Sequence, residues 1–310
     1  RRYFRACRRS AEGAAMNLST AHWRYSKKAP ACTATLKAKP EDFVVTEELG
    51  YDFSNDGEHQ FIWVEKTLAN TAWVAEHLAK FTGLPLRNVS YAGRKDKYAV
   101  TRQWIGLHAP GKADFDFSKL AIPGVKKLAQ HRHNKKLRTG QLKGNHFAIT
   151  LRNVSDADKL IAELQRAAVQ GVPNYFGDQR FGNVRIGETG ERLEGGNLQL
   201  AAKMVGGEAI RNRNKRNMAI SALRSWLFNE VISTRIKNGA LNTVLPGDAL
   251  MLSGSHSFFI NDGEDSTVQQ RYEQQDLSPT APLWGKGDLP SKTIAAALAL
   301  SVTEQFEPIT

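Results

Sequence analysis

The stretch "QFIWVEKTLANTAWVAEHLAKFTG", residues 60–83, decides the fold because its hydrophobic period changes midway. β-branched and aromatic residues with partial alternation predict a strand over 60–68. Apolar residues at helical spacing follow, Asn70 or Thr71 can cap the first turn, and Gly83 can end the last one. A helix is therefore predicted directly after the strand, and both element types contribute to the fold.

The strand signal recurs on both sides of this stretch. Segments with β-branched and aromatic residues lie at 41–49, 101–108 and 145–154. A second helix is expected after the last of them, with Asp156 as its cap and Gly171 at its end. The pattern indicates an α+β fold whose strands bring polar residues to one face.

The chain changes character near residue 171, where we place a domain boundary. A glycine-rich, irregular segment follows this point, and helical patterns then lie at 214–239 and 291–305. The expected domains are therefore residues 16–170 and residues 171–310.

The composition is that of an ordinary globular chain with an excess of basic residues. The 310 residues include 43 Lys and Arg against 31 Asp and Glu, for a net charge of +12, which favours a polyanion such as a nucleic acid as partner. Two cysteines and no run of 18 apolar residues predict a cytoplasmic chain without a membrane-spanning helix. Residues 1–15 are basic and precede Met16, so we interpret them as a leader outside the fold.

The strongest electrostatic feature is the segment 117–155, which contains nine Lys or Arg residues and no acidic residue. A solvated basic face and a track for RNA phosphates both explain such a run, and we favour the phosphate track. A second cluster, "RNRNKR" at residues 211–216, either decorates a helix start or contacts RNA. Cations at a helix start oppose the helix dipole, which favours an anionic partner there.

Asp96 is the single acid within "GRKDKYAVTRQW", residues 93–104. Composition alone favours a turn residue or a salt-bridge partner. The surrounding positive charge stabilises a carboxylate, which excludes a general acid near neutral pH and leaves a nucleophile or a base. If the segment were a strand, Lys95 and Lys97 would point to the face opposite Asp96.

Aromatic and histidine residues near the cations each have two interpretations. Aromatic residues such as Phe43 and Phe147 either pack in the core or stack on unpaired bases, at about 1–3 kcal/mol per contact. His131 and His133 flank Arg132, whose charge disfavours a metal ion, and no carboxylate or thiolate lies nearby in the sequence. No metal site is expected.

Five stretches, in this order, resemble the TruD family of tRNA pseudouridine synthases, and the resemblance spans residues 36–300. They are "KPEDFVVTE" (39–47), "SYAGRKDKYAVTRQW" (90–104), "LKGNHF" (142–147), "GVPNYFGDQRFG" (171–182) and "RNKR" (213–216). The resemblance implies a pseudouridine-synthase-like catalytic domain with a mixed or antiparallel sheet, and an α/β insertion (TRUD) domain from residue 171. It also implies isomerisation of uridine 13 of tRNA to pseudouridine without a cofactor or a metal. A monomer is expected.

By this match Asp96 is the catalytic aspartate. Phe43 and Asn145 match positions that contact the target nucleotide, and Lys95 and Phe147 carry over as further substrate-binding residues. The cations expected to bind RNA are Arg94, Lys97, Arg132, Lys135, Lys136, Arg138, Lys143, Arg180, Arg213, Lys215 and Arg216.

An ionised aspartate suits the implied reaction. The glycosidic C–N bond of the uridine breaks, the base turns, and its C5 bonds to C1′ of the ribose. Asp96 can attack C1′ directly, or it can remove the proton from C2′ to give a glycal. The sequence leaves both roles open.

The resemblance also implies a last part of the catalytic domain, with a stretch like Phe-x-Leu-Pro-x-Gly-Ser-aromatic-Ala-Thr. No such stretch precedes Thr310, so a chain truncated before the end of that domain, with exposed sheet edges, is expected. The alternative function is then a tRNA-binding protein without turnover. A basic RNA-binding module unrelated to isomerisation is disfavoured by the order of the five stretches.

Overall fold

The computed structural model describes residues 18–30, 32–255, 257–285 and 287–304, which divide into two compact units. We call residues 30–165 the sheet unit, and residues 18–29 together with 166–304 the helical unit. The division falls within α2 (Ala157–Gln170), a few residues before the expected boundary near residue 171. Residues 18–29, expected with the N-terminal domain, belong instead to the helical unit, and the expected leader at 1–15 lies outside the described residues.

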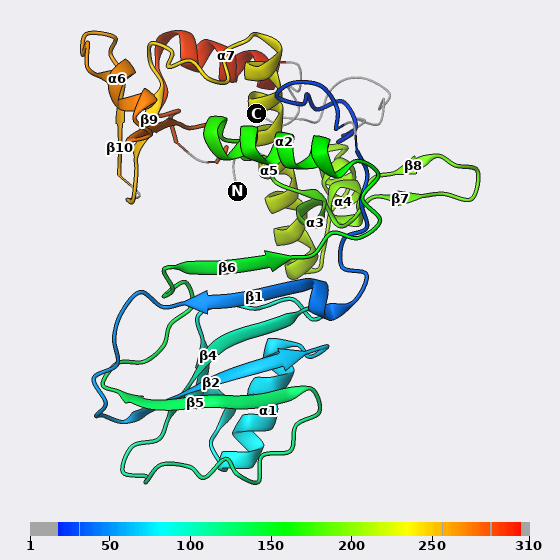
Figure 1. Ribbon diagram of the computed structural model, residues 1–310. Coiled ribbons are helices and arrows are strands. Elements are labelled where there is room, and N and C mark those ends of the chain that lie inside the picture. The colour runs from blue at the N-terminus through cyan, green and yellow to red at the C-terminus, as the bar shows by residue number, and fades with distance from the viewer. Residues whose placement is uncertain (1–17, 31, 256, 286, 305–310) are drawn as a thin grey trace. The chain divides into compact units, whose positions relative to one another are not determined.

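The sheet unit contains four strands that the sequence predicts and two that were not predicted, and Figure 1 shows the sheet beside one helix. The strands are β1 (Phe43–Glu48), β2 (His59–Thr67), β3 (Val89–Tyr91), β4 (Val100–His108), β5 (Val125–His133) and β6 (Gly144–Ile149). The predicted strand at 145–154 ends early, at Ile149. Beyond it the chain turns at Asn153, whose φ of 50° is incompatible with a continuing strand.

These strands form one mixed sheet. Their order is β5-β2-β4-β1-β6, and β3 also pairs with β4. β1 runs parallel to β4, whereas the β1–β6, β2–β4, β2–β5 and β3–β4 pairs are antiparallel. The expected α+β class with a mixed sheet is confirmed.

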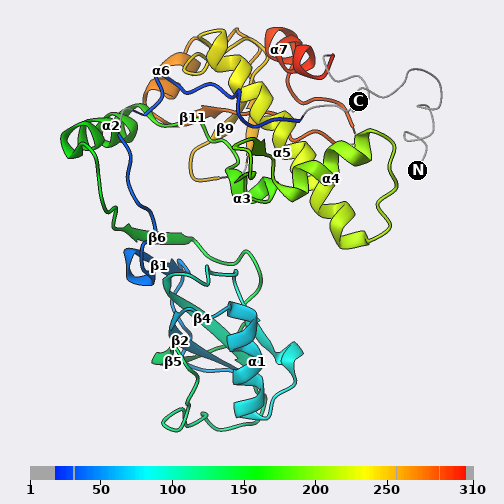
Figure 2. The same cartoon turned by 90° about the vertical axis from the view of Figure 1, so that its right-hand side faces the viewer.

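The helix α1 (Thr71–Thr82) matches the prediction from residues 60–83. It begins after Asn70 and ends at Gly83, whose φ of 65° is in the left-handed region that glycine adopts without a steric penalty. Val74 and Leu78, one turn apart, are fully buried against the sheet. Figure 2 shows this helix lying along the sheet.

Both faces of the central strands are covered, which explains why β2 has four consecutive apolar residues, 61–64. Ile62 and Val64 of β2 pack with α1 in one core cluster. Phe61, the neighbour of Ile62, belongs to a second cluster on the opposite face, which includes Leu49 and Leu137. The sheet unit therefore has a core on each side of β2.

The helical unit is organised around α5 (Arg213–Lys237), the longest helix. Its other helices are α3 (Asp178–Phe181), α4 (Gly196–Val205), α6 (Val268–Glu273) and α7 (Thr293–Glu304). The predicted apolar stripe of α5 is confirmed at Trp226, Leu227 and Val231, which are buried against α4 and α7, whereas Met218 is half exposed. Within the described residues, no helix has the length and apolar character that crossing a membrane requires.

Several elements of the helical unit were not predicted from the sequence. They are the hairpin of β7 (Arg185–Ile186) and β8 (Arg192–Leu193), the helix α4, and the sheet of β9 (Ala249–Leu252), β10 (Phe258–Ile260) and β11 (Leu277–Pro279). α4 begins at the glycine pair 195–196, and two adjacent glycines in a sequence are typical of a loop. Glycine is needed at Gly195 because a Cβ there would clash with the main-chain oxygen of Phe181.

Candidate active site

Asp96 lies in the loop between β3 and β4, which we call the Asp96 loop (residues 92–99). The strand geometry considered for residues 93–104 is wrong for this part of the segment, since β4 begins only at Val100. The Asp96 side chain is 41 % exposed. A partly exposed carboxylate on a loop can contact a substrate while the main chain of the loop is fixed by the elements that it packs against.

Hydrogen bonds from α1 and β4 hold the Asp96 loop. The main-chain N–H of Lys95 donates to Thr71 Oγ1 at 3.0 Å, and the Thr71 hydroxyl donates to Gln103 Oε1 at 2.8 Å. The amide of Gln103 in turn donates to the main-chain oxygen of Gly93 at 3.2 Å. Thr71 and Gln103 are both buried, so these bonds are shielded from water.

A buried ion pair anchors the same loop to β1. Lys95 Nζ lies 2.6 Å from Glu47 Oε2, and the two side chains are 6 % and 0 % exposed. The second carboxylate oxygen of Glu47 accepts a hydrogen bond from the main-chain N–H of Trp104 at 3.0 Å. The side chain of Lys95 therefore points into the protein and holds the loop, and its expected contact with the substrate remains a prediction.

Lys37 is the cation that contacts the Asp96 carboxylate. Its Nζ donates to Asp96 Oδ2 at 2.9 Å and lies 3.8 Å from the ring centroid of Phe43. A cation over an aromatic face is attracted by the ring quadrupole. Lys37 has a φ of 55°, a left-handed conformation that is uncommon for residues with a Cβ, so the backbone is strained at the residue that contacts the aspartate.

Phe43, Asn145 and Phe147 share one face of the sheet. In the antiparallel pairing of β1 with β6, Val45 lies opposite Phe147 and Glu47 opposite Asn145. Residues opposite each other, and those two positions along a strand, point to the same face, so all three face the side on which Glu47 binds the Asp96 loop. The rings of Phe43 and Phe147 meet edge to face at 5.9 Å, and Phe147 is 57 % exposed.

The motif "PEDF" fixes the start of β1, and with it the position of Phe43. The carboxylate of Asp42 is buried and accepts two hydrogen bonds from the guanidinium of Arg152, both at 2.7 Å, and one from the N–H of Lys39. The hydrogen bonds from Arg152 lower the pKa of Asp42 below its ordinary value, although burial opposes them. Asp42 is thus a structural acid that ties the residue before Phe43 to the segment after β6.

Some of the expected RNA-binding cations of the sheet unit are bound to other protein groups, and others are not. Arg132 is engaged by Asp114 and by two main-chain oxygens, and Lys143 pairs with Glu48 at 2.7 Å. The others have exposed side chains, and none forms an ion pair with a residue that the structure describes: they are Arg94, Lys97, Lys135, Lys136 and Arg138. These five are available to phosphate groups.

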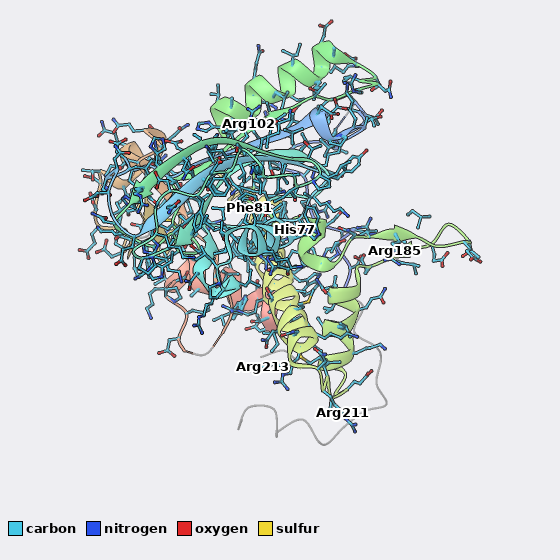
Figure 3. All side chains as sticks on the ribbon, turned by 90° about the horizontal axis from the view of Figure 1, so that it is seen from below. His77, Phe81, Arg102, Arg185, Arg211 and Arg213 are labelled. Carbon is cyan, nitrogen blue, oxygen red and sulfur yellow. The ribbon has the colours of Figure 1, made fainter. Side chains whose placement is uncertain are left out.

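The remaining expected cations lie in the helical unit. Arg213, Lys215 and Arg216 are exposed in the first turn of α5, and Figure 3 shows Arg213 at this end of the helix. Arg180 stacks on Phe176 at 4.9 Å and donates to Ser221 Oγ at 3.0 Å. Arg180, Phe176 and Ser221 line a cavity of about 610 Å³.

The two histidines considered as metal ligands have other contacts. His131 stacks on Phe53 with parallel rings 4.9 Å apart, and His133 Nδ1 accepts a hydrogen bond from the N–H of Ser54. Burial lowers the pKa of His133, with the Lys135 charge adding to the effect. Across the part of the chain that the structure describes, no group of three or more His, Cys, Asp or Glu is placed to hold a metal ion.

Three charged residues of the site were missed in the sequence: Lys37, Glu47 and Lys66. Lys66 Nζ donates to the main-chain oxygen of Asp96 at 2.8 Å. A signal for Lys66 existed, because it follows Ile62 and Val64 at a spacing of two and is therefore an inward position of β2. Lys37 had no local signal, since it lies 59 positions before Asp96.

Comparisons with known proteins identify the family. A family model described as "tRNA pseudouridine synthase D (TruD)" matches residues 21–217 and 208–305. A tRNA pseudouridine synthase D from Pseudoalteromonas atlantica is 51 % identical over 289 residues, covering 93 % of this chain and 81 % of the relative. The chain belongs to the TruD family. It is therefore a pseudouridine synthase, an isomerase, and the resemblance of its five stretches is confirmed.

Other TruD proteins agree with this assignment. A tRNA pseudouridine synthase D from Aeromonas hydrophila is 46 % identical, covering 91 % of this chain and 77 % of the relative. The solved structure of a protein described as "Putative tRNA pseudouridine synthase D (TruD)" from Methanosarcina mazei has a TM-score of 0.70 at 20 % identity, covering 92 % of this chain and 80 % of that one. At this identity the solved structure supports the fold alone. The relatives are named as synthases, so nothing in these comparisons favours a tRNA-binding protein without turnover.

Proposed function

We propose that this chain isomerises uridine 13 of tRNA to pseudouridine, with ionised Asp96 as the catalytic residue. The observation that carries this proposal is a partly exposed Asp96 carboxylate paired with Lys37, whose ammonium also lies over the ring of Phe43, the edge-to-face partner of Phe147. Lys37 supplies the cation that pairs with the Asp96 carboxylate, at 2.9 Å. An ionised carboxylate can attack C1′ or remove the C2′ proton, and the arrangement serves either step.

The two phenylalanines provide a surface for the uracil. An unpaired base that leaves its stack costs a few kcal/mol, and stacking on an aromatic ring returns about 1–3 kcal/mol. Phe147 is more than half exposed and lies edge-on to Phe43, so a base can contact either ring. Asn145, exposed on the same strand, can exchange hydrogen bonds with the uracil edge.

The two units take the roles of the expected domains in this proposal. The sheet unit carries the catalytic residue, and the helical unit corresponds to the insertion (TRUD) domain with its own exposed cations. The chain acts as a monomer in the cytoplasm and needs neither a metal nor a cofactor, because isomerisation requires only a carboxylate and a bound nucleotide.

Chemical mapping of pseudouridine tests the site of the reaction. The chain is incubated with an unmodified tRNA transcript and, in parallel, with the same transcript carrying cytidine at position 13. Product at position 13 of the first transcript and none in the second is the expected result. Product at another position contradicts the proposed uridine, and binding without product in the first transcript contradicts the proposed turnover.

The affinity for tRNA is expected to depend steeply on salt. If four to six cations each contact one phosphate, the slope of log K against log salt is roughly −3 to −5. Replacing the exposed Lys135, Lys136 and Arg138 by Ala should flatten that slope by about two to three. The control is Lys80→Ala, an exposed lysine on α1 across the sheet, and an equal effect of both changes would contradict a phosphate track.

A further inference from the structure

The buried ammonium group of Lys66 makes contacts that the proposed reaction has not yet used. Lys66 is 1 % exposed, although it lies on β2 in line with Ile62 and Val64 and faces the apolar core around α1. Its Nζ donates to the main-chain oxygens of Ala69 and Asp96, both at 2.8 Å, and of Lys95 at 3.4 Å.

These contacts match a protonated lysine. An ammonium group has three N–H donors, and three main-chain oxygens surround Nζ, whereas a neutral amine has two donors. A buried charge is costly, and an apolar side chain of similar volume in its place is often neutral or stabilising. The core alone therefore does not explain a lysine at this position.

The acceptors of Lys66 point to the reason. Two of the three belong to the Asp96 loop, and one of these is the carbonyl of the proposed catalytic residue itself. The third, Ala69, immediately precedes the cap residue of α1, so Lys66 ties the loop to a rigid element. The side chain of Asp96 is held separately by Lys37 at its Oδ2.

We propose that Lys66 is a positioning residue for catalysis, holding the main chain of Asp96 from inside the sheet so that its carboxylate meets the ribose of the target uridine. The proposal rests on the proposed role of Asp96. Lys66 itself is too buried to touch the RNA, so it acts through the loop. Reacting groups that shift by about 1 Å can lose roughly 10²-fold in rate.

The protonation of Lys66 gives this role a pH signature. Burial lowers the pKa of Lys66 from 10.5 to about 8, with Asp96 opposing the decrease and Lys95 adding to it. The carboxylate of Glu47 on β1 is bound to Lys95, the β4 residue opposite Lys66 is the uncharged Thr101, and the first turn of α1 carries no acid. As pH rises through 8, Lys66 loses one donor and its charge, so the Asp96 loop loses a tether.

Single-turnover kinetics of Lys66→Met test the proposal, with tritium release from C5 of the uracil as the readout. The rate constant is expected to fall about 10²-fold, while the affinity for tRNA stays within about twofold because the exposed cations are unchanged. The matched control is Lys80→Met, an exposed lysine on α1 outside the basic segment 117–155, which should keep the rate of the unmodified chain.

The pH profile separates positioning from a structural role. The rate of the unmodified chain should decline above pH 8, and Lys66→Met should lack this decline. If Lys66→Met does not fold, Thr71→Val, which removes another hydrogen bond to the same loop, is expected to lower the rate without weakening tRNA binding.

Three results would overturn the proposal: an unchanged rate in Lys66→Met, a loss of rate matched by an equal loss of affinity, or the same alkaline decline in both proteins. In the event that Lys66→Met does not fold, an unchanged rate in Thr71→Val overturns it. Asp96→Asn, run in parallel, distinguishes this failure from a failure of the proposed function. If Asp96→Asn is inactive and Lys66→Met is fully active, only the proposed role of Lys66 is contradicted. If Asp96→Asn is active, the proposed function on which that role rests is contradicted as well.

Discussion

Asp96→Asn is expected to bind tRNA with unchanged affinity and to lose pseudouridine formation by at least about 10³-fold. The amide has nearly the same shape as the carboxylate, and it can keep a contact with Lys37, but it is neither a nucleophile nor a base near neutral pH. The exposed cations that meet phosphates are not touched by the change. Mapping of pseudouridine together with a filter-binding assay of the same preparation measures both quantities.

A matched control accounts for the change in charge. Asp56→Asn also removes one negative charge from the sheet unit, at an exposed loop position, and should keep full activity. Full turnover in Asp96→Asn would show that another group does the chemistry. Equal losses in both variants would indicate a general electrostatic effect on tRNA binding, and they would also contradict the assignment.

Glu47→Ala is expected to lower the free energy of unfolding of the sheet unit by about 3–5 kcal/mol, because it breaks a buried ion pair from one side. The change leaves the ammonium of Lys95 buried without its counter-charge, and it leaves the N–H of Trp104 without an acceptor. Denaturant unfolding gives the free energy, and hydrogen exchange at the amides of β1 and β4 locates the loss. The Asp96 loop should open with these strands.

The neighbouring acid provides the control. Glu48→Ala removes a carboxylate whose partner Lys143 is 67 % exposed, and solvent-exposed pairs contribute little to stability. The double change Glu47→Leu with Lys95→Met should recover most of the stability lost in Glu47→Ala, since an apolar pair has no charge to leave unpaired. Similar losses in Glu47→Ala and Glu48→Ala would contradict a special role of the buried pair.

Local signals predicted four of the six strands of the sheet unit, whereas β3 and the basic strand β5 were not predicted. The change of period in residues 60–83 gave β2 and α1 almost to the residue, because a strand and an amphipathic helix each leave a repeating apolar pattern. The strands β9, β10 and β11 have only three or four residues each, too few for a period to be recognised. α4 was missed because it begins at a glycine, which is not a typical helix start. Glycine is required there by the close approach of the main chain of Phe181, a contact that the sequence does not show.

The site was predicted only where a motif marked it. Asp96, Phe43 and Phe147 were named from stretches of sequence, and the pairing of β1 with β6 brings the two rings together. Lys37 could not be recognised in this way, because its contact with Asp96 joins residues 59 positions apart. The spacing of Lys66 marks an inward position, but it does not reveal the contact with Asp96, 30 positions away. Such contacts follow from the sheet register and the path of the loop, which no short window of sequence contains.

The antiparallel register of β1 and β6 also determines where insertions can be tolerated. Side chains alternate between faces, so one residue inserted between Asn145 and Phe147 would place these two side chains on opposite faces of the sheet. Residues added to the exposed loop before Gly144 would leave that alternation intact, at a small cost in loop entropy. Homologues that keep the function should therefore vary in length in the loop between β5 and β6, but not within β6.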